Sequence, residues 1–175
     1  MASRLSDFFG KKGTRYDKSV APDRLEKILG LLALVLLGVA IAAVIKGRPE
    51  WHKMPWQLWT HLGTLALVLA ITPLMLWRKR GDDLHRLFGW IWAIAMLTTA
   101  LVSFDIRWIN DGGFSVIHLL SIMTVIGVPV LILSARRRDF GRHRGQVRGF
   151  VIGALLVAGF FTFPFDRLLG RWLFG

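Results

Sequence analysis

Four histidines stand at the ends of long apolar runs, and the residues around them repeat along the chain. His61 opens a segment that leads to His85, 24 positions later, and His118 opens a similar segment that leads to His143, 25 positions later. Each segment contains a proline, a run of basic residues and a closing His-Arg pair. Histidine is costly inside a membrane and is a common ligand of metals and haem. The repeat therefore predicts two histidine pairs, one near each face of a membrane.

The composition is typical of an integral membrane protein. Of the 175 residues, 54% are hydrophobic, and the apolar residues gather in five runs. A soluble domain of this size rarely carries five apolar runs of about 18–20 residues. Helices are expected, because an open strand would leave backbone groups unpaired in lipid. We predict an all-α membrane bundle of about five transmembrane helices, in which spans two to five form a four-helix core of two duplicated hairpins. The predicted spans are 28–45, 57–77, 84–104, 114–134 and 146–165.

The chain divides into a basic N-terminal segment (1–27), the transmembrane bundle (28–165) and a short interfacial tail (166–175). Asp23 and Glu26 form an Asp-x-x-Glu pattern that signals the start of the first helix. Pro73 and Pro129 occupy matching positions in spans two and four and are expected to kink both helices in a similar way.

The distribution of lysine and arginine predicts the orientation. The formal net charge is +12, which in a soluble protein would suggest nucleic acid, but here 17 of the 23 basic residues fall on one side of the predicted spans. We therefore expect no nucleic-acid partner and contact with the lipid bilayer instead. The positive-inside rule places the N-terminus in the cytoplasm and the C-terminus in the periplasm, for a multi-pass protein of a bacterial inner membrane.

The histidines are the candidate cofactor ligands. His61 and His118 lie at the same level near the outer face, and His85 and His143 lie near the inner face. Between facing helices, each pair would supply two imidazoles to one iron. The chain has no cysteine, which excludes iron–sulfur clusters and covalently attached haem, so any haem would be of the b type, with one or two per chain. Arg86 and Arg144 are candidate partners for haem propionates.

Two other observations narrow the options. All eleven carboxylates fall in loops or at helix ends, which disfavours ion-coupled transport, because transporters usually need a charged group in mid-membrane. Interfacial histidines are also ordinary residues of membrane proteins, because the ring is at home among headgroups. A structural role, with hydrogen bonds across helices, is therefore the alternative to ligation.

The chain resembles an uncharacterised family of bacterial integral membrane proteins, domain of unknown function 2306. The resemblance rests on His61, Pro73, Arg78, the string Leu84-His85-Arg86-Leu87-Phe88-Gly89, His118 and Arg142-His143-Arg144. It covers spans two to five and implies a multi-span membrane protein of open activity.

The layout is also similar to the cytochrome b561 family, in which the four core helices hold two b haems between two histidine pairs. That similarity implies His61 with His118 and His85 with His143 as ligands. The chain departs from the family in having five predicted spans rather than six, and no donor site such as one for ascorbate is recognisable.

Two functions follow as expectations. The first is a di-haem b membrane cytochrome, a possible transmembrane oxidoreductase that exchanges electrons with a quinone or another small reductant; a single haem on the outer pair is a variant of it. The second is a non-catalytic subunit or assembly factor of a larger membrane complex. Haem content distinguishes the two.

Overall fold

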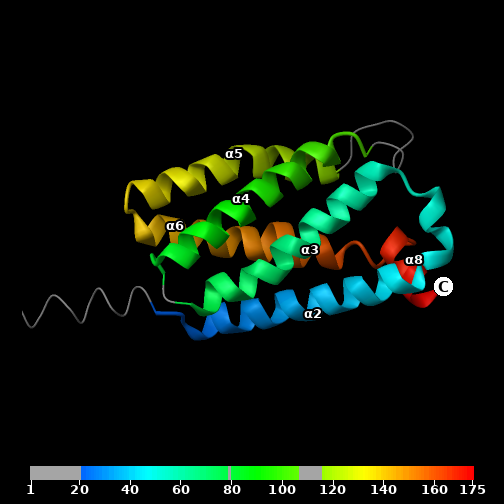
Figure 1. Cartoon of the computed structure of the whole chain (residues 1–175), viewed down its shortest axis with the longest axis horizontal. Helices are drawn as coiled ribbons and strands as arrows, with labels where there is room; N and C mark the ends of the chain where they lie inside the picture. The colour runs from blue at the N-terminus through cyan, green and yellow to red at the C-terminus, as the bar shows by residue number, and fades with distance from the viewer. Residues whose placement is uncertain (1–20, 79, 107–115) are drawn as a thin grey trace, which may run out of the picture.

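A computed structural model describes residues 21–78, 80–106 and 116–175, with the backbone alone for Val116. Within these ranges every regular element is a helix (Figure 1), as the sequence predicts. The predicted N-terminal segment lies mostly outside the described residues. The elements are α2 (Arg24–Lys46), η1 (Arg48–Lys53), α3 (Trp56–Trp77), α4 (Asp83–Ser103), α5 (Val116–Arg136), α6 (Phe140–Gly149), η3 (Phe150–Val157), α7 (Ala158–Phe160) and α8 (Leu168–Phe174).

In the part of the chain that the structure describes, four helices are long and apolar enough to cross a membrane. They are α2, α3, α4 and residues Ile117–Arg136 of α5. The predicted fold class, an integral membrane helical bundle, is confirmed. The predicted start signal of α2 is also present, because Asp23 accepts a hydrogen bond from the Glu26 amide (3.0 Å) and Glu26 accepts one from the Asp23 amide (3.1 Å).

The fifth predicted span has a different form from the other four. Residues 140–160 are helical without a break, but the helix passes from α6 through the π-helical segment η3 into α7. It begins six residues before the predicted span and ends five residues before the predicted end at 165. Pro164 follows the end of α7, and proline lacks the amide hydrogen that a continuing helix needs.

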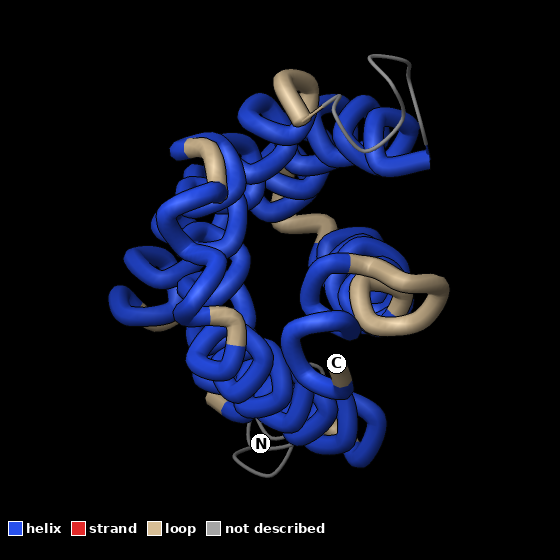
Figure 2. The backbone as a smooth tube through the Cα atoms, turned by 90° about the vertical axis from the view of Figure 1, so that its right-hand side faces the viewer, coloured by secondary structure: helices blue, strands red, loops and turns tan. Residues whose placement is uncertain are grey.

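The helices form a closed ring of contacts. Consecutive helices pack together from α2 to α6, and η3 returns to pack against α2. Figure 2 views the helices nearly end-on and shows this curved arrangement. In consequence α4 lies against both α3 and α5, which carry the two outer histidines of the sequence pattern.

The core of the ring is apolar and closely packed. Val68, Val128 and Val151 are buried, and the Trp92 ring meets Phe150 edge-on at 6.1 Å. The Trp92 indole donates a hydrogen bond to the Thr72 hydroxyl (3.1 Å), so the one polar atom of this side chain is satisfied. This apolar layer separates two polar ends of the bundle.

Candidate histidine sites at the two ends of the bundle

The two ends differ in chemistry. We call the end where α2 and α4 begin the basic end, since Arg80, Arg144 and Arg148 gather there (left in Figure 1). We call the end where α3 begins the tryptophan end, after Trp51 and Trp59, whose rings meet edge-on at 5.1 Å. His61 and His118 belong to the tryptophan end, and His85 and His143 belong to the basic end.

At the tryptophan end, His61 is held by α4. The His61 Nδ1 lies 2.9 Å from the Ser103 hydroxyl oxygen, and that hydroxyl donates its own hydrogen to the Thr99 carbonyl (2.6 Å). The Ser103 oxygen is therefore the acceptor, and His61 Nδ1 is the donor. This assignment makes Nε2 the unprotonated nitrogen of His61, and an unprotonated imidazole nitrogen is the kind of atom that can bind a metal ion.

His118 lies at the same end, on the other helix that packs against α4. It is 2% exposed, and its ring centre is 6.2 Å from that of Phe104, the residue that follows Ser103. Ser121 and Thr124, on the same side of α5, are also buried. His61 therefore contacts Ser103, and His118 lies beside the next residue, Phe104. Both histidines meet the end of α4 in a buried polar region.

At the basic end, His85 and His143 line one cavity. Its volume is about 20 Å³, and Glu26, Arg80 and Arg144 also line it. The His143 Nδ1 donates to the Leu131 carbonyl (3.2 Å), which again leaves Nε2 free of its proton. The buried Nδ1 of His85 has no hydrogen-bond partner within the described part of the chain.

The basic-end cavity does not fit a haem. A cavity of this volume holds about one water molecule, whereas drug-sized ligands occupy pockets of roughly 300–1,000 Å³. At the tryptophan end, His61 presents Nε2 with Nδ1 anchored and His118 is buried at the same level, which is the donor set that a bis-histidine haem needs. Among the described residues, no three His, Cys, Asp or Glu side chains group closely enough to hold a metal ion.

The two candidate propionate partners are paired with carboxylates. Arg86 pairs with Asp83 at the surface, where the two side chains are 69% and 92% exposed. Arg144 donates two hydrogen bonds to Glu26, from Nε at 2.7 Å and from Nη2 at 3.0 Å. Both guanidinium groups lie at the basic end, so neither is close to His61 and His118.

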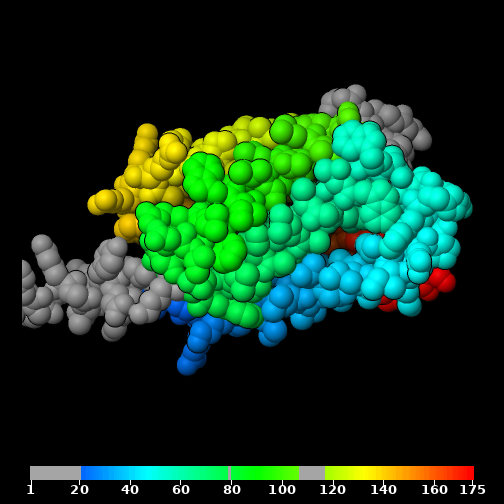
Figure 3. Space-filling view, viewed as in Figure 1, coloured from blue at the N-terminus to red at the C-terminus, as the bar shows by residue number. Residues whose placement is uncertain are grey.

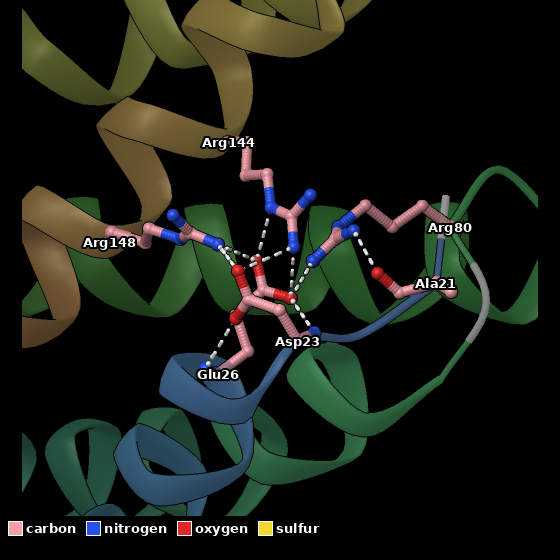
Figure 4. A network of polar contacts seen from close by, with 6 residues as sticks. All are labelled: Ala21, Asp23, Glu26, Arg80, Arg144 and Arg148. Carbon is pink, nitrogen blue, oxygen red and sulfur yellow. Dashed lines mark hydrogen bonds and ion pairs between the residues drawn. The ribbon is translucent and has the colours of Figure 1, made fainter. Parts of the chain in front are cut away.

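An ion-pair cluster at the basic end was not predicted from the sequence. Glu26 is 1% exposed and pairs with Arg80, Arg144 and Arg148, while Asp23 pairs with Arg144 and Arg148 (Figure 4). From the sequence, Asp23 and Glu26 are expected only to start the first helix. The partners lie far along the chain, and no local pattern links them to α2.

The charge of Asp23 is expected to stabilise the fold above about pH 4. The hydrogen bond from the Glu26 amide, and next the Arg148 guanidinium, lower the pKa of Asp23 from its ordinary value of 3.8. A lowered folded-state pKa gives stability that is present above the unfolded value and is lost as the pH falls through the folded value. Asp23→Asn keeps a capping side chain and removes the charge. Thermal melts from pH 7 to pH 3 measure this effect. The melting temperature of the wild type should exceed that of Asp23→Asn at pH 6, and the difference between the two should disappear below about pH 4. A gap that stays constant with pH would contradict this role of the charge.

Comparison with known proteins finds no matching family model, no similar curated protein and no similar solved structure. The resemblances to the uncharacterised membrane family and to cytochrome b561 therefore stay predictions. The function must be argued from the sites themselves.

Proposed function

We propose that the protein is a membrane electron carrier that binds a b-type haem between His61 and His118. The observation that carries the proposal is the donation from His61 Nδ1 to Ser103, which leaves Nε2 available at the level of the buried His118. A hydrogen-bond acceptor on the other ring nitrogen orients a ligating imidazole and raises its basicity. A bound haem would supply one-electron chemistry through its iron.

The residues around the proposed ligands hold the site in place. Ser103 fixes the plane of the His61 ring, and the Thr64 and Thr99 hydroxyls lie 2.6 Å apart one turn further into the bundle. These contacts join α3 to α4 at two successive turns, so the ligand on α3 has little freedom to rotate. The apolar layer around Val68 and Val128 separates this end from the charged one. In this proposal the electron donor is a quinone or another small reductant, and the basic end faces the cytoplasm of a bacterial inner membrane.

We propose one haem per chain. The cavity between His85 and His143 holds about one water molecule, so a haem at the basic end is not part of this proposal. The two-haem version stays a prediction of the sequence pattern. Haem quantified per chain in the purified protein, before and after addition of haemin, distinguishes one haem from two and from none.

Ser103→Ala is expected to weaken haem binding by about 10–100-fold, because it removes the acceptor that orients His61. The matched control is Ser134→Ala, since Ser134 is a buried serine at the basic end, where its hydroxyl donates to the Leu131 carbonyl of its own helix (2.7 Å). Haemin titration of the apoprotein measures the haem affinity of both variants. Equal affinities for the two variants would show that Ser103 does not position a ligand.

A non-catalytic membrane subunit is the second candidate. Two hydrogen bonds between α3 and α4 favour it. One joins His61 to Ser103 and the other joins Thr64 to Thr99, and neither needs a ligand. In that case the purified protein is colourless, does not take up haemin, and co-purifies with a larger membrane complex.

A further inference from the structure

An apolar groove runs between α2 and the end of the fifth helix, on the side towards the tryptophan end. Its volume is about 550 Å³. It is open and lined by side chains that offer no hydrogen bond. Its walls are Leu32, Val35, Leu36 and Val39 on α2, and Leu156, Phe160, Phe163, Pro164, Leu173 and Phe174 from the later chain.

The groove lies along a helix that crosses the membrane. Val35 and Phe160 remain 55% and 61% exposed within it. In a bilayer such a surface meets hydrocarbon and not water. Gly159 shows how closely the two walls approach beside the groove, because a Cβ there would come within 2.6 Å of Leu36. In a bilayer, the hydrocarbon that such a surface meets is the acyl chains of lipids.

Positive charge stands at one end of the groove. Lys46, the last residue of α2, donates a hydrogen bond from Nζ to the carbonyl of Leu173 (2.8 Å), and Leu173 is itself a wall residue. Arg171, two residues before Leu173, is exposed and pairs at 3.7 Å with Asp166, whose side chain is 80% exposed. Lys46 ends α2 and Arg171 lies on α8, and both helices supply walls of the groove, so two cations flank the same end of it.

We infer that this groove is a binding site for an anionic phospholipid, whose acyl chain lies along α2 and whose phosphate contacts Lys46 and Arg171. The apolar walls supply the affinity for the chain, because each methylene group that they bury is removed from a polar environment. The two cations supply the preference for a negative headgroup. This site is independent of the histidines and does not rest on the proposed haem.

The test is native mass spectrometry of the full chain, reconstituted with phosphatidylglycerol or with phosphatidylcholine of the same acyl chains. We expect one phosphatidylglycerol to remain bound per chain, several-fold more often than phosphatidylcholine. Val35→Trp fills the groove and should remove most of the adduct. Leu34→Trp adds the same ring to the neighbouring residue, which is 39% exposed and lies outside the groove, and should retain the adduct.

Arg171→Gln tests the headgroup contact and keeps the hydrogen bond from Lys46 to the wall residue Leu173. It should reduce the preference for phosphatidylglycerol over phosphatidylcholine while leaving some binding of both. Equal retention in Val35→Trp and Leu34→Trp would overturn the inference. So would a co-purified isoprenoid quinone, in place of phospholipid, that Val35→Trp displaces.

Discussion

Glu26→Gln is expected to destabilise the folded bundle by about 3–5 kcal/mol, the usual cost of removing one partner from a buried ion pair. Glu26 is 1% exposed, and its carboxylate is paired with Arg80, Arg144 and Arg148. A neutral amide at this position leaves Arg144 and Arg148 with Asp23 as the remaining carboxylate of the cluster (Figure 4). The cluster joins the first turn of α2 to α6 and to the residues before α4, so its loss should release α2 from the bundle.

The measurement is the free energy of unfolding in mixed detergent micelles, with Asp83→Asn as the control. Asp83 also pairs with an arginine, but its side chain is 92% exposed, and exposed ion pairs contribute little. Both variants remove one negative charge. If Glu26→Gln unfolds at the same detergent composition as Asp83→Asn, the cluster does not anchor α2.

The second large effect is expected at His118. His118→Phe should reduce haem per chain to below about a tenth of the wild-type content, because a bis-histidine haem loses an axial ligand. Phenylalanine keeps an aromatic ring beside Phe104 and avoids the cavity that alanine would leave at this buried position. His61→Phe should have the same effect. Difference spectra and haem quantification measure the loss.

His52→Phe is the control for these variants. His52 lies in η1 and is exposed, so its replacement should leave haem content unchanged. His85→Phe should also leave it largely unchanged, since the basic-end cavity does not accommodate a haem. Loss of haem in His85→Phe, with the fold intact, would favour the two-haem prediction over the single site.

The elements were largely predictable, since apolar runs and capping residues are local features. The start of α2 follows from Asp23 and Glu26, and the matched prolines Pro73 and Pro129 lie inside α3 and α5. The π-helical form of the fifth helix was not predictable, because a shift to i→i+5 bonding leaves no mark in hydropathy. The helix boundaries differ from the predicted spans by a few residues, as helix ends commonly do.

The sites were predictable in part. The repeat indicated which histidines share an end of the bundle, and the structure places His85 and His143 on one cavity. The size of that cavity depends on how the helices pack, which no spacing reveals. The ion-pair cluster likewise depends on tertiary contact, because Arg144 and Arg148 lie more than a hundred positions from Glu26.

Figure 3 shows how the structural parts relate on one face of the molecule. Side chains of α3 and α4 cover most of this face, and near the tryptophan end the surface is hollowed between α2 and α3, with later residues of the chain at the base. The basic end holds the ion-pair cluster, whereas the opposite end holds the proposed haem ligands and the apolar groove.

The most direct test of the central claim is an optical spectrum of the detergent-purified protein, oxidised and then reduced with dithionite, with haem quantified per chain. The proposal predicts a low-spin b-type signal at about one haem per chain, which is lost in His61→Phe and His118→Phe. A protein that is colourless as purified, and that stays colourless after haemin is added, would contradict it and would favour the role of a structural subunit.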